Sequence, residues 1–245
     1  MMKIDIKCSQ NKVGQKYINC NTELLNMNTK EIVKRYILFI VSLFFSALGV
    51  AVTKHGELGV SPISSVANVM SCKYEAVSLG TWLVIWNCIL ILGQVVILKK
   101  SFRPIQLLQL PLSLLFGIFT DIGMIFADYI SVPNYFVRIS LVVCGTVILA
   151  FGIALSVIAN VVMNSGEAFV KAVSDKSGMK FGNVKIGFDI CCVVLSIALS
   201  LIFFGGSIVG TREGTILTAL FTGVAVKIFI KIFESPLEKI LTQEE

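Results

Sequence analysis

Charged side chains are scarce in this sequence. Only 15% of its 245 residues are Asp, Glu, Lys or Arg, whereas soluble domains usually contain about 25%. Hydrophobic residues make up 56%, and the mean hydropathy is +0.86. This composition excludes an ordinary soluble enzyme, a disordered chain and a nucleic-acid-binding protein. The excess of Lys+Arg (21) over Asp+Glu (15) is typical of a membrane protein, which collects basic residues in its cytoplasmic loops.

Residues and motifs that support catalysis or metal binding are also missing. The chain has one histidine, His55, and its seven cysteines include no Cys-x-x-Cys pair, which argues against a zinc site and a disulfide framework. No GxxxxGK[ST], HExxH or GxSxG motif is present. We therefore expect a protein that is not an enzyme and that has no metal and no cofactor.

The sequence does contain six apolar runs long enough to cross a bilayer, which needs about 20 residues. They predict an all-α polytopic membrane protein with six transmembrane helices. The first run begins too late for a secretory signal peptide, so we expect a polar tail at 1–33, with a second tail at 235–245. The predicted transmembrane helices lie at residues 35–54, 79–98, 105–127, 137–162, 184–204 and 213–233.

The placement of basic residues predicts the orientation of these helices. If both termini are cytoplasmic, twelve of the Lys and Arg residues at helix ends and loops lie inside and only four lie outside. The positive-inside rule favours this arrangement. We expect a multi-pass protein of the cell membrane with cytoplasmic termini. The four outside residues are Lys54, Lys73, Arg138 and Arg212.

Two segments, at 61–73 and 165–176, are too short or too polar to span a membrane but begin as helices do. Ser61-Pro62 offers an N-cap serine followed by proline at the first helical position. Asn164-Ser165 offers a similar start to the second segment. We expect the first short helix near the outer face and the second near the inner face. The sequence leaves open whether either re-enters the membrane.

The two halves of the sequence match each other as an ordered series of positions, at offsets from 102 to 106. Each half, 34–130 and 131–234, holds three long runs and one short helix. Because three is odd, the halves insert in opposite orientations and form two inverted-topology repeats. Many secondary transporters are built this way, with substrate near the midplane. The corresponding positions are Gly49 and Gly152, Ser64 and Glu167, Gly80 and Gly182, Asn87 and Asp189, Gly117 and Gly223, and Asp121 and Lys227.

Six motifs carry a resemblance to a known family. They are Gly59-Val60-Ser61-Pro62-Ile63-Ser64, Gly80-Thr81, Phe116-Gly117-Ile118-Phe119-Thr120-Asp121, Asn164-Ser165-Gly166-Glu167, Asn183-Val184-Lys185 with Asp189, and Gly210-Thr211-Arg212-Glu213-Gly214-Thr215. On these motifs, residues 34–233 resemble the YczE/YyaS/YitT-type family of bacterial integral membrane proteins. The resemblance implies a membrane location and a helical fold, and no settled substrate. Members usually carry an acidic residue a little after the glycine- and proline-containing turn of the first half, where this chain has Ser64 or Ser65. The chain keeps an acidic residue, Glu167, only in the second half.

Nine polar or charged residues in or beside the apolar segments are candidates for substrate binding. An ionised side chain at membrane depth costs about 2.5–3.5 kcal/mol on insertion scales, so such residues are functional candidates by default. The candidates are Ser61, Ser64, Asn87, Asp121, Ser165, Glu167, Lys185, Asp189 and Arg212.

Structural roles compete with binding at each charged candidate. Asp121 could instead pair with a neighbouring helix, and Glu167, in the first turn of a short helix, could stabilise the helix dipole. Lys185 and Asp189 are four residues apart and can pair along one helix. Arg212 could lie in a surface turn.

These features favour a small-solute secondary transporter with its site at the interface of the two repeats. The absence of a nucleotide-binding motif predicts coupling to protons or Na⁺. The alternative is a non-enzymatic accessory or regulatory membrane protein that binds a partner and needs no cavity. Both hypotheses predict contact with membrane lipids and none with nucleic acid, and both are compatible with a homo-oligomer.

Overall fold

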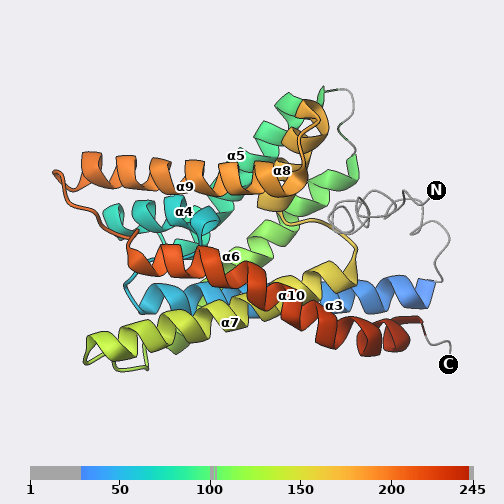
Figure 1. Ribbon diagram of the computed structural model, residues 1–245, viewed down its shortest axis with the longest axis horizontal. Helices are drawn as coiled ribbons and strands as arrows, with labels where there is room; N and C mark the ends of the chain where they lie inside the picture. The colour runs from blue at the N-terminus through green and yellow to red at the C-terminus, as the bar shows by residue number, and fades with distance from the viewer. Residues whose placement is uncertain (1–28, 100–101, 103, 243–245) are drawn as a thin grey trace, which may run out of the picture.

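The computed structural model describes residues 29–99, 102 and 104–242, which form helices and connecting loops with no β-strand among them. The predicted polar tail at 1–33 therefore falls almost entirely outside the described residues. The elements, in chain order, are α3 (Thr29–His55), α4 (Pro62–Lys73), α5 (Leu79–Leu98), η3 (Pro104–Leu108), α6 (Gln109–Ala127), α7 (Tyr135–Ala159), α8 (Ser165–Ser177), α9 (Phe181–Phe203) and α10 (Glu213–Thr242) (Figure 1).

Six of these helices, α3, α5, α6, α7, α9 and α10, are long and apolar enough to cross a membrane, as the sequence predicts. Helix α5 has the predicted bounds, 79–98. The largest difference is at the end of α10, which continues through Pro236 to Thr242 instead of ending at 233. Its last turn is packed against α3, because Leu241 is buried and the carbonyl of Ile240 accepts a hydrogen bond from Lys34 Nζ (3.2 Å).

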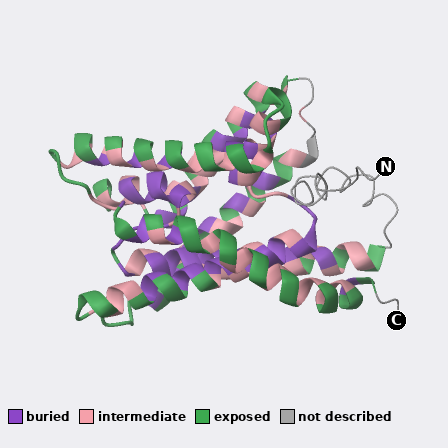
Figure 2. Ribbon diagram, viewed as in Figure 1, coloured by how far each residue is buried: buried purple, intermediate pink, exposed green. Residues whose placement is uncertain are grey.

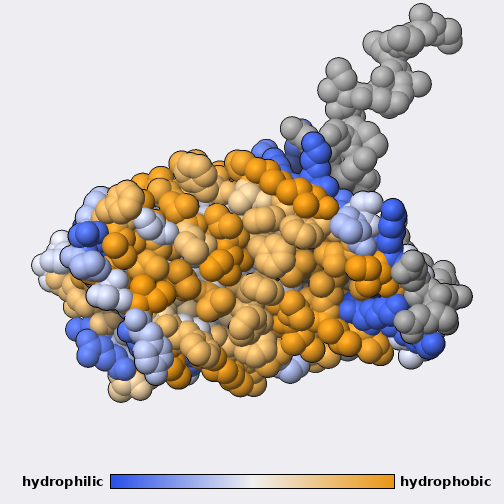
Figure 3. Space-filling model, turned by 90° about the horizontal axis from the view of Figure 1, so that it is seen from below, coloured by the Kyte–Doolittle hydropathy of each residue, from blue (hydrophilic) through white to orange (hydrophobic). Residues whose placement is uncertain are grey.

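The outer surface of the protein is largely apolar. Figure 3 shows hydrophobic side chains covering the body of one face, with hydrophilic side chains gathered at its two ends. Large exposed hydrophobic residues follow the outer sides of α9 and α10, among them Ile190, Val194, Ile216 and Leu220. An exposed apolar surface of this extent marks a region that contacts lipid or protein. The chain is thus a multi-pass membrane protein whose helices contact lipid.

Helices α3 and α7 cross at the centre of the molecule with their backbones in close contact (Figure 2). A Cβ atom added to Gly49 would lie 2.4 Å from the backbone nitrogen of Leu149, and one added to Gly152 would lie 2.4 Å from that of Ser46. Small residues allow such close approach between membrane helices. This crossing forms the buried centre around which the other helices pack.

The remaining helices form two groups on either side of α6. Helices α4, α5, α8 and α9 pack on one another, and α10 packs along α7 beside α3. Helix α6 joins the groups, because it packs on both α3 and α5. In Figure 1 the labels α4, α8 and α9 lie above α3, α7 and α10.

Helix α3 begins and α10 ends at the same end of the molecule (Figure 1). We call this end, which carries Thr29 and Thr242, the terminal face. The opposite end carries His55 and Glu213 and is called the distal face. Both ends of the described chain therefore lie at the same end of the molecule, which agrees with an even number of crossings. The assignment of the terminal face to the cytoplasm rests on the positive-inside rule and stays a prediction.

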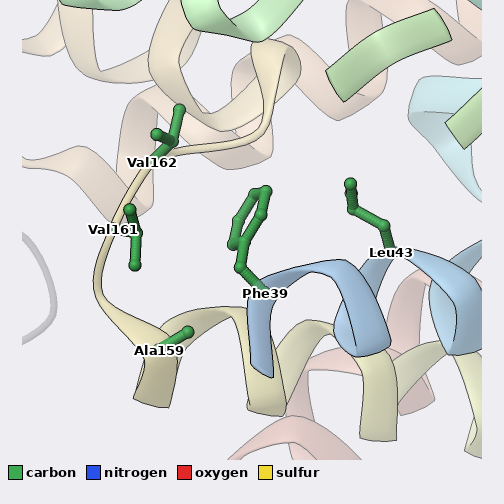
Figure 4. Close-up of a cluster of buried hydrophobic side chains, with 5 residues drawn as sticks. All are labelled: Phe39, Leu43, Ala159, Val161 and Val162. Atoms are coloured by element: carbon green, nitrogen blue, oxygen red, sulfur yellow. The ribbon is translucent and has the colours of Figure 1, made fainter. Parts of the chain in front are cut away.

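The loop between α7 and α8 returns into the molecule before α8 begins. Its residues Val161 and Val162 are buried and pack with Phe39 and Leu43 of α3 and with Ala159 (Figure 4). A polar loop could not lie there, because its side chains would lose their hydrogen bonds to water. The two valines therefore allow a short helix to start inside the protein.

Candidate functional site

The short helices α4 and α8 begin near the middle of the molecule, with their first turns in contact. A Cβ on Gly166, in the first turn of α8, would lie 3.1 Å from Cδ1 of Ile63, in the first turn of α4. Ser65 Oγ lies 3.4 Å from the carbonyl oxygen of Cys192, at the midpoint of α9. Each helix then leads away from this contact, α4 toward the distal face and α8 toward the terminal face (Figure 1). Both short helices therefore begin inside the protein, beside each other.

The first turn of α8 is held by a buried network of amides and hydroxyls. Gln94 Nε2 donates to Gln109 Oε1 (3.1 Å) and to the carbonyl oxygen of Ser165 (3.1 Å), and Gln109 Nε2 donates back to Gln94 Oε1 (3.3 Å). The hydroxyls of Ser113 and Ser165 lie 3.2 Å apart. Ser165, a candidate for substrate binding, is buried and serves here to fix α8 against α5 and α6.

Helix α4 is held by a smaller set of polar contacts. Ser61 Oγ donates to Ser64 Oγ (3.0 Å), and Asn68 Nδ2 donates to the carbonyl oxygen of Gly210 (2.5 Å). Neither Ser61 nor its counterpart Asn164 uses its side chain to cap the helix that follows. The candidates Ser61 and Ser64 thus lie at the start of α4, where their neighbour Ile63 contacts the start of α8.

Three charged candidates come together on α8 and α9. Lys185 and Asp189 form an ion pair along α9, and the charges of both act on the carboxyl group of Glu167. The two paired side chains are 28% and 26% exposed. We call Glu167, Lys185 and Asp189 the charged cluster.

The face of α9 that carries the charged cluster points into the protein. Cys192, Ser196 and Ser200 continue this face toward the distal end of the helix and are buried, with Ser196 accepting a hydrogen bond from Thr211 Oγ1 (2.9 Å). Lys185 and Asp189 lie on the same face but keep a quarter of their surface accessible. The inner side of α9 is thus covered in its distal half and partly open in its terminal half.

The environment of Glu167 favours its neutral form. Helix α8 is not one of the six spanning helices, and burial raises the pKa of the Glu167 carboxyl, while nearby Lys185 lowers this pKa and Asp189 raises it. Glu167 makes no hydrogen bond or ion pair with the described residues. A carboxyl group with these properties keeps its proton to a higher pH than an exposed one does.

Asp121 has a different set of neighbours. Its Oδ1 accepts a hydrogen bond from the backbone N–H of Gly80 (2.8 Å), and its Oδ2 accepts one from Ser78 Oγ (2.7 Å). Ser78 Oγ also accepts from the backbone N–H of Thr81 (3.1 Å), so Ser78 and Asp121 together cap α5. The structure gives Asp121 a role in joining α6 to the start of α5, near the distal face.

The remaining candidates lie apart from the charged cluster. Arg212 is half exposed and lies 3.5 Å from Glu213 at the start of α10. Asn87 lies halfway along α5, is partly exposed and makes no hydrogen bond within the described part of the chain. Among residues 29–99, 102 and 104–242, no three His, Cys, Asp or Glu side chains lie together as metal ligands would.

Sequence reasoning did not select Arg35, Gln94, Gln109 or Ser113, although all four are buried polar residues. Arg35 pairs with Glu31 (2.8 Å) and lies 3.4 Å from the carbonyl oxygens of Ile158 and Ala159 at the end of α7. The i, i+4 spacing of Glu31 and Arg35 was a usable signal for the ion pair. Gln94 and Gln109 were visible as amides within apolar runs, but their pairing depends on how α5 and α6 pack.

Residues 33–231 match a family described as "Family of unknown function (DUF6198)". The chain belongs to this family. No curated protein and no solved structure matches the chain. The match covers most or all of each spanning helix and both short helices. The first four residues of α3 and the last eleven of α10 lie outside it. The charged cluster and the capping residue Asp121 all lie within the DUF6198 region. The narrower resemblance to the YczE/YyaS/YitT-type family remains a prediction.

Proposed function

We propose that this member of DUF6198 is a non-enzymatic small-solute secondary transporter, built from two inverted-topology repeats and working by alternating access. The solute would bind at the charged cluster, beside the first turns of α4 and α8. The observation that carries the proposal is a difference between two corresponding helix contacts. The contact in the first half is closed near the distal face, and its counterpart in the second half is open toward the terminal face.

The packing of the helices supports the repeat. Helix α4 packs along α9 as α8 packs along α5, and α6 packs on α3 as α10 packs on α7. Arg35 and Arg138 are 103 positions apart in the sequence, and each lies at the end of the other half's first helix. Arg35 approaches the last carbonyls of α7, and Arg138 pairs with Glu57, two residues beyond α3. These correspondences are what a pseudo-twofold axis in the membrane plane produces.

One pair of corresponding contacts breaks this symmetry. Helix α5 packs closely along α6, and a Cβ on Gly80 would lie 2.1 Å from the carbonyl oxygen of Gly117. Helices α9 and α10 hardly touch. A Cβ on Gly182 or Gly223, the counterparts of these glycines, would meet no atom within 4 Å. Gly80 and Gly117 are thus in contact in the first half, whereas their counterparts Gly182 and Gly223 are separated in the second.

This asymmetry supports the proposal, because a transporter open on one side would have it. The α5–α6 contact closes the distal side, while the separation of α9 from α10 leaves the charged cluster accessible from the terminal side. A second state would follow from exchanging the two conformations, so that Gly182 approaches Gly223 and α5 leaves α6. With the terminal face in the cytoplasm, as the positive-inside rule favours, the described state faces inward.

The charged cluster also suggests the class of solute. It offers carboxylates and an ammonium group close together, with Lys185 and Asp189 partly exposed and Glu167 buried behind them. Together these charges complement a small zwitterionic solute. Glu167 has no partner of its own in the described structure, so it is the residue we expect to bind a coupling proton or Na⁺. The wider prediction of a homo-oligomer plays no part in this proposal.

The test is ligand-dependent thermal unfolding of the purified protein in detergent. The wild type, Glu167→Gln and Asp189→Asn would be screened against amino acids, amines, organic acids and Na⁺. Lys171→Gln, which breaks the similar Lys171–Asp175 pair on the exposed part of α8, is the matched control. A bound ligand at 100 times its Kd adds about 2.7 kcal/mol of stability. A solute-specific shift retained by the control and lost in both cluster variants supports the proposal, and justifies uptake assays in liposomes. A flat response across the panel would favour the accessory-protein alternative.

A further inference from the structure

A groove on the lipid-facing surface lies between α7 and α10. It has a volume of about 240 Å³, and eight residues line it: Val143, Thr146, Val147, Leu217, Phe221, Val224, Ala225 and Ile228. The one polar member, Thr146, already donates its hydroxyl to the carbonyl oxygen of Val142 (2.6 Å) and lies 3.3 Å from Thr218 Oγ1. The lining offers no free hydrogen-bonding group, so its occupant must present hydrocarbon.

The groove has the dimensions and direction of a single acyl chain. Its residues on α10 recur every three or four positions from Leu217 to Ile228, and therefore form a line parallel to the helix axis. At 1.5 Å per residue this line is roughly 16 Å long, about half of the 30 Å hydrocarbon core. A chain lying in the groove would therefore run along the membrane normal through about one leaflet.

Positive charge marks one end of the groove. Lys231 follows Ile228 by three residues and continues the same line of side chains toward the terminal face, with Lys227 one turn earlier. Both side chains are exposed and neither makes a hydrogen bond or ion pair with the described residues. An ammonium group held at this depth is positioned to meet the phosphate layer of the leaflet on that side.

We propose that this groove and Lys227 and Lys231 together form a binding site for an anionic phospholipid. One acyl chain lies between α7 and α10, and the two lysines bind the headgroup. Unpaired positive charge lies at only one end, since Glu213, one turn before Leu217 at the other end, is a carboxylate beside Arg212. This favours a lipid over a second copy of the chain, because an anionic lipid carries its charge at one end of its hydrocarbon. The inference is independent of transport, since it needs neither the charged cluster nor a second conformational state.

The test measures binding to the full-length protein in a mild detergent by native mass spectrometry and thermal unfolding, with phosphatidylglycerol or phosphatidylcholine added. We expect phosphatidylglycerol to be retained and to raise the unfolding midpoint more than phosphatidylcholine. Each lysine near an anionic surface contributes roughly fivefold in affinity. Lys227→Gln with Lys231→Gln should therefore weaken phosphatidylglycerol binding strongly and leave phosphatidylcholine unaffected, and Lys176→Gln with Lys180→Gln is the matched control.

The acyl-chain part of the site needs its own variant. Ala225→Phe fills the groove and should reduce retention of both lipids, whereas Ala198→Phe places the same side chain at an exposed position of α9. Equal binding of the two lipids, or equal effects of the two phenylalanine variants, would overturn the proposal. So would a dimer that forms in delipidated wild type and is lost in Ala225→Phe, because the groove would then be a protein interface.

Discussion

The carboxylate of Asp121, in the distal half of α6, accepts a hydrogen bond from the backbone N–H of Gly80 at the start of α5, with a nitrogen–oxygen distance of 2.8 Å. One membrane helix therefore caps another across 41 positions of sequence. The cap matters more in a membrane than in water, because unpaired N–H groups in a helix's first turn have no solvent to bind.

Replacing Asp121 with asparagine should destabilise the protein. The amide oxygen can accept one of the two hydrogen bonds at most, and the charge that favours the helix N-terminus is lost. We expect a loss of about 1.5–3 kcal/mol, the range for hydrogen bonds to charged groups, seen as a lower unfolding midpoint in detergent. Asp175→Asn, at an exposed carboxyl of α8, should change the midpoint much less. An Asp121 variant of unaltered stability that loses a ligand response would instead assign this residue to binding.

The glycines Gly80 and Gly182 provide a test of the asymmetry between the halves. Gly80→Ala places a methyl group against the backbone of α6, which cannot move aside as a flexible side chain could, so α5 must separate from α6. Gly182→Ala meets open space. We expect Gly80→Ala to lower the unfolding midpoint and Gly182→Ala to leave it unchanged. Equal effects of the two changes would mean that the halves pack alike in the membrane.

A buried arginine supports the terminal end of the bundle. The Arg35 side chain is 6% exposed and is held by Glu31 and two α7 carbonyls. Arg35→Met should cost about 3–5 kcal/mol, because it leaves Glu31 without its partner and the last carbonyls of α7 without a donor. Arg138→Met removes the corresponding arginine at the distal face, where the side chain is 31% exposed, and should cost much less. Denaturation by urea or heat, compared between the two variants, measures the difference.

The stability of the protein should fall as pH rises through the range in which Glu167 ionises. Burial raises the pKa of this carboxyl above its unfolded value of 4.5, so the unfolded chain releases the proton at lower pH than the folded protein does. Between these two pKa values the folded state binds more protons, and the free energy of unfolding decreases with pH. Glu167→Gln removes this dependence. Above about pH 4.5, the unfolding midpoint of the wild type should therefore fall relative to that of Glu167→Gln. The difference should then level off at higher pH.

A suitable control for that pH series is Asp175→Asn, because Asp175 is an exposed carboxyl on the same helix. The difference in unfolding midpoint between Asp175→Asn and wild type should not move in favour of the variant as the pH rises. A Glu167 difference that is flat over the whole series would mean that water reaches this carboxyl freely in both states.

The helices could be predicted from sequence because each one depends on local residue order. The apolar runs located all six spanning helices, and Ser61-Pro62 and Asn164-Ser165 located the short helices to within one or two residues. The end of α10 was missed, since Pro236 is tolerated within the helix and the last turn is stabilised by Lys34 of α3. That contact joins residues far apart in the chain, and no local pattern predicts it.

The partners of the candidate residues were harder to predict than the helices. The spacing of Lys185 and Asp189 allowed a pair along α9, but the order of lysine before aspartate slightly favoured a partner elsewhere. The structure shows that the two side chains do pair with each other. The neighbours of Asp121 come from a different helix, so its choice between binding and capping could not be made before α5 and α6 were placed together. The contact of Ile63 with Gly166 likewise depends on two loops that return into the molecule.

The paired amides of Gln94 and Gln109 set an order on assembly. They belong to α5 and α6, which leave the ribosome before α8, and the carbonyl of Ser165 binds to Gln94 once α8 has been made. In the nascent chain the two amides satisfy each other within the bilayer, because each donates to the other. Helices α5 and α6 can thus pair in the membrane before α8 is made. Helix α8 then docks on a surface that these two helices have already formed.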